Sequence, residues 1–177
     1  GFGLVYQAYD KHQRAWYALK EYLPSGIASR GPDRQRISAN SARYQQAYDQ
    51  GLKRFIEEGR TLSRLSHPHI VKQHRHIEAN GSGYLVMDYI EGQTLEQYRS
   101  QHPEPITPER IQNWLRQLLS ALETLHAQPL LHRDIKPQNI MIDEEGHAIL
   151  IDFGAARQVV GELTQTLEVI VSPPYSP

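Results

Sequence analysis

The sequence predicts an α+β fold, in which short strands and amphipathic helices occupy different stretches of the chain. Strands are expected at residues 16–20 and 83–92, where apolar residues alternate or run between turn residues. A helical stripe follows Thr107, and two short apolar strands, 140–142 and 148–151, flank a turn at 143–146. The 177 residues are within the usual size of one domain.

The composition is that of a soluble globular protein. Hydrophobic residues make up 39% of the chain, charged residues 22%, and the net charge is −1, which argues against a nucleic-acid-binding arm or an acidic tail. No apolar run approaches the roughly 20 residues of a membrane span. The first residues do not have the pattern of a signal peptide. Cysteine is absent, which excludes disulfides and thiolate metal sites, and a cytoplasmic protein is expected.

The first half of the chain predicts a strand, a polar stretch and a helix. Residues 16–20 alternate like a strand, and residues 55–65 place apolar side chains at helical spacing. Gly59 inside that helix is expected to cost about 1 kcal/mol relative to alanine. The enlarged segment at about residues 21–50 is polar, and we expect a solvated loop that extends the helix. The alternative is a docking surface formed by its arginines, which are Arg30, Arg34, Arg36 and Arg43.

A second helix is expected to begin at Thr107-Pro108-Glu109. These residues supply a capping side chain, proline at the first helical position and an acid in the first turn. Apolar residues then recur at intervals of three and four, which predicts a stripe facing a core. The stripe consists of Ile111, Trp114, Leu115, Leu118, Leu119, Leu122 and Leu125.

The most informative stretch is residues 132–139, H-R-D-I-K-P-Q-N, with Asp152-Phe153-Gly154 beginning 13 residues after Asn139. A hairpin over the intervening strands would return Asp152 to Asn139. Phosphoryl transfer needs a carboxylate that orients the attacking hydroxyl and oxygens that hold Mg²⁺. The pattern H-R-D-x-K-x-x-N, strand, turn, strand, D-F-G resembles the catalytic loop and DFG segment of the eukaryotic-type (Hanks-type) serine/threonine protein kinases.

The resemblance implies a two-lobed protein kinase fold that binds ATP and Mg²⁺. Asp134 would orient the substrate hydroxyl and accept its proton, and Lys136 would neutralise the transferring phosphoryl group. Asn139 and Asp152 would bind Mg²⁺. Met141 would contact the nucleotide, while His132 and Phe153 would be packing residues of the regulatory spine.

The resemblance extends to the N-terminal half. Residues 1–6 resemble the end of the glycine-rich loop, and residues 16–20 resemble the V-A-I-K strand, whose lysine reaches the α/β-phosphates. Lys20 would pair with a glutamate, and counting back ten residues from Pro68 selects Glu58. The residues that would contact the nucleotide are Gly1, Gly3, Val5, Ala18, Lys20, the gatekeeper Met87, and the backbone groups of Asp88 and Ile90.

The resemblance covers nearly the whole chain and implies a partial catalytic domain. Residues 1–90 would form the N-lobe and residues 91–177 the start of the C-lobe through the activation segment. We expect a catalytic domain truncated at both ends, so that the isolated chain is poorly stable and nearly inactive. The motif K-E-Y-L-P-S, which begins at Lys20, is similar to the sequences of bacterial kinases that have an enlarged segment at this position.

Control by phosphorylation is suggested by Arg133 before the catalytic aspartate, because a phosphate could pair with its guanidinium. Thr164 and Thr166 lie where that phosphate is expected, and the choice between them stays open. Ser172 matches the threonine that contacts the catalytic aspartate in the family.

The predicted function is transfer of the ATP γ-phosphoryl group to Ser or Thr hydroxyls of a protein substrate, with no nucleic-acid partner. The oligomeric state is not predicted. One alternative is a pseudokinase that regulates a partner through its fold, or a chain that is inactive as it stands. A small-molecule kinase of similar fold is disfavoured by Lys136 and by Ser172-Pro173.

Overall fold

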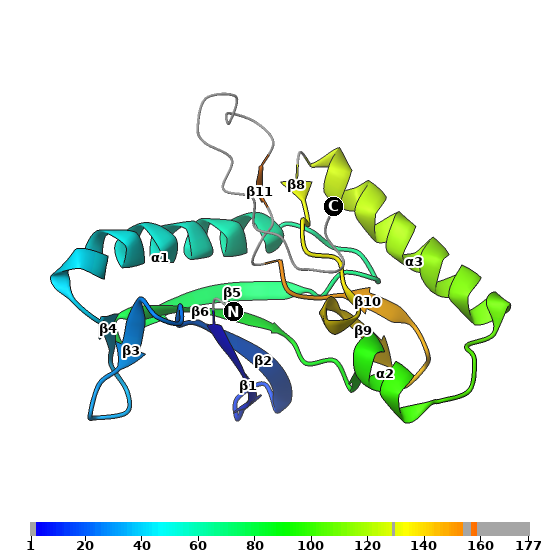
Figure 1. Ribbon diagram of the computed structural model, residues 1–177, viewed down its shortest axis with the longest axis horizontal. Helices are drawn as coiled ribbons and strands as arrows, with labels where there is room; N and C mark the ends of the chain where they lie inside the picture. Colours follow the sequence, from blue (N-terminus) through cyan, green and yellow to red (C-terminus); the bar gives the residue numbers. More distant parts are fainter. Residues whose placement is uncertain (1–2, 129, 154–156, 159–177) are drawn as a thin grey trace. The chain divides into compact units, whose positions relative to one another are not determined.

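The structure is a computed structural model that describes residues 3–128, 130–153 and 157–158 (Figure 1). These residues form two compact units. Unit 1 contains residues 3–64 and 72–89, and unit 2 contains residues 65–71 and 90–158. Among the described residues, no helix combines the length and apolar character that crossing a membrane would require.

Unit 1 is built on a four-stranded antiparallel sheet with the order β1-β2-β6-β5. Its strands are β1 (Gly3–Asp10), β2 (Ala15–Tyr22), β5 (Gln73–Ala79) and β6 (Ser82–Asp88). Asn80 and Gly81 both have positive φ, so they form the tight turn between β5 and β6. The strands expected at residues 16–20 and 83–92 are present as β2 and β6, although β6 ends at Asp88.

Helix α1 (Ala42–Leu62) runs along this sheet (Figure 1). The helix expected at residues 55–65 therefore begins 13 residues earlier and ends three residues earlier. Gly59 faces β6, and a Cβ at this position would lie 2.3 Å from Cδ2 of Leu85. The glycine that looked like a weakness in the sequence allows the helix to approach the sheet closely.

The enlarged segment is part of unit 1, and its last residues extend the helix as expected, because α1 begins at Ala42. The expectation that the rest is a solvated loop was wrong. Strands β3 (Ala28–Arg30) and β4 (Ile37–Ala39) pair as a hairpin, which we call the insert hairpin. Ile37 is only 2% exposed and belongs to the same apolar cluster as Tyr22 and Phe55. The N–H of Ile37 also donates to the carbonyl of Asn80 at 2.8 Å. Only a few apolar residues anchor this polar segment, which explains why its composition indicated a loop.

Unit 2 carries a three-stranded sheet, order β10-β9-β7, and a two-stranded sheet of β8 and β11. Its elements in chain order are β7 (Gly92–Thr94), α2 (Leu95–Gln101), α3 (Pro108–Ala127), β8 (Leu130–Leu131), the 3-10 turn η1 (Pro137–Asn139), β9 (Ile140–Asp143), β10 (Ala148–Leu150) and β11 (Arg157–Gln158). Helix α2 was not predicted, although Thr94 and Gln97 form a capping box at its start.

Helix α3 begins as predicted, with Thr107 as its N-cap and Pro108 in its first turn. It packs on the β9–β10 hairpin, since Trp114 Nε1 donates to the carbonyl of Gly146 at 2.9 Å. The predicted stripe is only partly buried. Three of its members are 43%, 52% and 61% exposed, namely Ile111, Leu115 and Leu119. Seven apolar residues span a wider arc of the helix than the described part of unit 2 covers.

Candidate active site

The loop between β8 and β9 is anchored by His132, which is 2% exposed. Its Nδ1 accepts the backbone N–H of Asp134 at 3.3 Å, so Nε2 carries the proton and donates to the carbonyl of Ile151, also at 3.3 Å. Burial holds the pKa of His132 below its ordinary value, which keeps the ring neutral. The ring of Phe153 packs against it with a centroid separation of 4.7 Å. The histidine therefore links the segments that carry Asp134 and Asp152.

Three predicted catalytic-loop residues form one cluster. Lys136 Nζ lies 2.8 Å from Oδ2 of Asp134, and Nδ2 of Asn139 donates to that same oxygen at 2.8 Å. Nδ2 also donates to the backbone carbonyl of Asp134 at 2.8 Å. Both partners of the Asn139 amide nitrogen are acceptors, so the nitrogen must face them. The side-chain oxygen of Asn139 is thus the atom suited to ligating a cation.

The β9–β10 hairpin returns Asp152 to this cluster, as the sequence predicted. Ile140 pairs with Leu150, and one residue further the N–H of Ile151 donates to the carbonyl of Asn139 at 3.0 Å. Asp152 follows directly and is exposed. The hairpin therefore holds Asn139 and Asp152 at the same end of β9 and β10.

Backbone strain is concentrated at the same place. Arg133 and Asp152 have φ values of 61° and 58°. The other non-glycine residues with positive φ in the described part of the chain, Arg14, Arg34 and Asn80, lie between paired strands. A strained conformation that no tight turn requires is typical of a functional site.

The residues at this site fit Mg²⁺ by their chemistry. Mg²⁺ prefers oxygen ligands and is usually bound by one or two carboxylates together with substrate phosphates. The exposed carboxylate of Asp152 and the side-chain oxygen of Asn139 are ligands of this kind. Met141, which the resemblance implies as a nucleotide contact, lies in β9 opposite Thr94 and is half-buried.

In unit 1 the strand register places Lys20 on the face of the sheet that α1 covers. Lys20 pairs with Leu85, and directly opposite residues point to the same face. Leu85 is the residue that touches Gly59 of α1. Lys20 is 7% exposed, and Glu58 is the half-buried helix residue that precedes Gly59. Lys20 therefore points from the sheet toward α1, the helix that carries Glu58.

The same face carries the residues implied as adenine contacts. Val5 pairs with Lys20, and Ala18 pairs with Met87. Because side chains alternate along a strand, Val5, Ala18 and Met87 share the face of Lys20. Val5 is 61% exposed, whereas Met87 is 8% exposed. Strands β2 and β6, about 70 residues apart in the chain, thus contribute to one surface, which is buried at Met87 and exposed at Val5.

The remaining predicted nucleotide contacts are placed as follows. Gly3 opens β1 opposite Tyr22. The N–H of Asp88 donates to the carbonyl of Lys72 at 2.9 Å, so this N–H is already used within unit 1. Ile90 is half-buried and belongs to unit 2. Gly1, Gly154, Thr164, Thr166 and Ser172 lie outside the described residues.

Sequence reasoning missed Glu21, which follows Lys20 in β2 and is 1% exposed. Its carboxylate binds Arg30 of the insert hairpin and the hydroxyl of Tyr6. An acid between Leu19 and Tyr22 in the interior of a strand was the available signal, because a buried acid needs partners.

Comparison with known proteins agrees with this geometry. The sequence profile of the protein kinase domain matches residues 1–177. A probable serine/threonine-protein kinase of Dictyostelium discoideum is 31% identical over 166 residues, or 94% of this chain and 32% of that protein. The serine/threonine-protein kinase PknD of Mycobacterium tuberculosis is 35% identical over 167 residues, 94% of this chain and 22% of that protein. PrkC of Bacillus subtilis is 37% identical over 125 residues, 70% of this chain and 19% of that protein.

A solved structure, the apo form of PpkA-294, has the same fold with a TM-score of 0.82 and 39% sequence identity. The match covers 88% of this chain and 55% of that one. The chain thus spans about a fifth to a third of the curated relatives and about half of the solved one. The sequence profile, the relatives and the fold agree, and the chain belongs to the protein kinase domain family.

Proposed function

We propose that the protein is an ATP-dependent protein serine/threonine kinase. The observation that carries this proposal is the cluster of Asp134, Lys136 and Asn139, to which the β9–β10 hairpin returns Asp152. Each of these residue types supplies what phosphoryl transfer needs, and all of them come from one short stretch of unit 2. The relatives whose names describe serine/threonine-protein kinases support the same substrate class.

The proposed roles follow from the chemistry of each side chain. Asp134 orients the acceptor hydroxyl and takes its proton, and Lys136, 2.8 Å from that carboxylate, balances charge on the transferred group. Asn139 and Asp152 hold Mg²⁺, which when bound neutralises the phosphate oxygens. Lys20 pairs with the α/β-phosphates and with Glu58.

We further propose that the two units are the two lobes of one catalytic domain. Unit 1 would bind the nucleotide through Val5, Ala18 and Met87, which the register of β1, β2 and β6 supports. The backbone carbonyl of Asp88 would also contact it, since the N–H of Asp88 already donates to Lys72. Unit 2 would receive the protein substrate at Asp134. The proposed substrate is a protein with a Ser or Thr acceptor.

The test is γ-phosphoryl transfer from labelled ATP to casein-type acceptors with Mg²⁺, using the full-length protein and its Asp134→Asn variant. Glu144→Gln is the matched control, because Glu144 is an exposed acid in the turn of the same hairpin. Label on Ser or Thr is expected with the wild type and with Glu144→Gln, and not with Asp134→Asn.

Other outcomes separate the alternatives. Absence of transfer by every variant, with ATP binding intact, would refute the kinase and favour a pseudokinase that acts through its fold. Equal transfer by the wild type and Asp134→Asn would show that Asp134 does not have the proposed role.

A further inference from the structure

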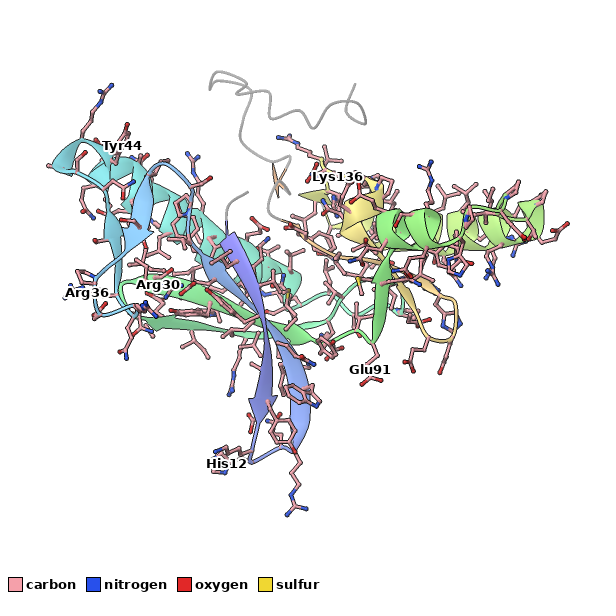
Figure 2. All side chains as sticks on the ribbon, turned by 60° about the horizontal axis from the view of Figure 1, so that its bottom comes forward. His12, Arg30, Arg36, Tyr44, Glu91 and Lys136 are labelled. Carbon is pink, nitrogen blue, oxygen red and sulfur yellow. The ribbon has the colours of Figure 1, made fainter. Side chains whose placement is uncertain are left out.

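The insert hairpin touches the sheet of unit 1 at a buried acid. Glu21 is 1% exposed, and its Oε2 forms an ion pair with Nη2 of Arg30 in β3. The hydroxyl of Tyr6 in β1 donates to the same oxygen at 2.8 Å. Nη2 of Arg30 also donates to that hydroxyl at 3.0 Å, which closes a three-membered network. Figure 2 shows Arg30 close to the sheet and Arg36 further out on the insert.

The network reaches a third strand of the sheet. Tyr84 in β6 is hydrogen-bonded to Glu21, and its hydroxyl also accepts the side-chain amide of Asn80 at 3.2 Å. One carboxylate therefore joins β2 to β1, to β6 and to the insert hairpin. Among the described residues, Glu21 is the acid that brings these four segments together.

The pair is charged in the folded protein. Burial by itself raises the pKa of Glu21, but hydrogen bonds from Tyr84, Arg30 and Tyr6 outweigh burial and hold that pKa below its ordinary value. The hydrogen bond to Glu21 raises the pKa of Arg30. A carboxylate this deeply buried requires its cation, because an uncompensated buried charge is costly.

The three network residues that belong to the sheet are each adjacent in sequence to a residue on the face that would bind the nucleotide. Glu21 follows Lys20, Tyr6 follows Val5, and Tyr84 precedes Leu85. Val5, Lys20 and Leu85 are register partners across β1, β2 and β6. Because side chains alternate along a strand, Glu21, Tyr6 and Tyr84 lie on the face of the sheet opposite to Lys20, at neighbouring positions of the same three strands. The network therefore holds the three strands in register where Lys20 emerges.

We propose that Glu21, held by Arg30 of the insert hairpin, is a positioning residue that sets the placement of Lys20 and β1 for ATP. The enlarged segment is then part of the nucleotide site and not a surface loop. This inference rests on the proposed function. It differs from a purely structural role because it predicts weaker nucleotide binding in protein that is still folded.

The test uses the full-length protein with Arg30→Met, Glu21→Gln and the matched control Arg36→Met. Arg36 is an exposed arginine of the same segment, so its loss removes the same charge without touching Glu21. Three quantities are measured at a temperature where circular dichroism shows every variant to be folded. They are the KM for ATP in phosphotransfer, with kcat, and the Kd of a fluorescent ATP analogue.

We expect Arg30→Met and Glu21→Gln to raise both the KM for ATP and the Kd by about tenfold, with a smaller change in kcat. Arg36→Met should match the wild type. Arg30→Lys, which restores the charge, should recover part of the affinity. The double variant, Arg30→Met with Glu21→Gln, should bind ATP no more weakly than either single variant, because the two residues act as one pair.

Unchanged KM and Kd in folded Arg30→Met would overturn the inference and leave the insert a stabilising element only. A wild type that binds the analogue but transfers no phosphate would refute the proposed function, and the Kd comparison would still test the positioning role. A wild type that binds no nucleotide would refute both.

Discussion

At the scale of single residues, the candidate site is organised by contacts that the motif letters do not describe. His132 is neutral and joins the backbone of Asp134 to that of Ile151 through its two ring nitrogens. Asn139 uses its amide nitrogen to hold Asp134, which turns its oxygen toward other ligands. These contacts orient the two groups within the protein itself, and such preorganisation is what electrostatic catalysis requires.

Lys20→Met is expected to abolish phosphotransfer and leave the fold intact. The substitution removes the charge that would hold the α/β-phosphates but keeps an apolar side chain of similar length in a site that is 7% exposed. Initial rates and circular dichroism of the full-length protein check this expectation. Lys53→Met, at an exposed position of α1, is the control. Full activity of the Lys20 variant would refute its assigned role.

Asn139→Ala is expected to raise the Mg²⁺ concentration needed for half-maximal activity, because it removes one proposed oxygen ligand. It also frees Asp134 from two hydrogen bonds, so the maximal rate should fall as well. A Mg²⁺ titration of the rate measures both effects. Asn113→Ala, on the exposed side of α3, should titrate like the wild type. An unchanged Mg²⁺ midpoint for Asn139→Ala would exclude Asn139 as a ligand.

At the scale of elements, α1 and the insert hairpin are anchored to the same turn of the sheet. The helix extends to Ala42, and Tyr48 in its first half donates to the carbonyl of Gly81 at 2.7 Å. Ile37 of the insert donates to the neighbouring carbonyl of Asn80. Both elements therefore hold the β5–β6 turn, and Arg30 adds the contact to Glu21.

Ile37→Ala is expected to lower the free energy of unfolding by about 2–5 kcal/mol, because it empties a core position that is 2% exposed. Ile111→Ala removes the same atoms from a position that is 43% exposed, and it should change the free energy of unfolding by less than about 0.5 kcal/mol. Urea denaturation of both variants provides the comparison. Equal effects would show that the insert is not packed as described.

At the scale of the whole molecule, a net charge of −1 conceals two units of opposite sign. Residues 1–64 and 72–89 contain 13 lysines and arginines against eight acids, a net charge of +5, whereas the rest of the chain carries −6. A positive unit attracts polyanions, which suits the unit proposed to bind ATP. Overall composition had indicated only a near-neutral soluble protein.

The free energy of unfolding is expected to fall as the pH drops below 6.5. Burial lowers the pKa of His132 in the folded state, so the unfolded state takes up a proton in this range before the folded state does. More protons bound to the unfolded state means that stability rises with pH. Denaturation at several pH values should show a shallower slope for His132→Asn than for the wild type. His67, whose pKa burial also lowers, contributes equally to both proteins. Identical slopes would show that His132 is not held neutral.

The sequence alone predicted what depends on local order along the chain. The α+β class, the start of α3 at Thr107, and the hairpin that returns Asp152 to Asn139 all follow from patterns within a few residues, because turns, caps and strand alternation are local. The catalytic-loop cluster was predictable for the same reason, since Asp134, Lys136 and Asn139 lie within six residues.

Only the tertiary structure decided what depends on partners far along the chain. It showed that Ile37 is buried and Leu119 is exposed, and that Gly59 makes a close contact with Leu85. It also showed that Arg30, one of four similar arginines, neutralises Glu21. Burial and charge pairing depend on which surfaces meet, and composition and periodicity do not specify that for a polar insert with few apolar anchors.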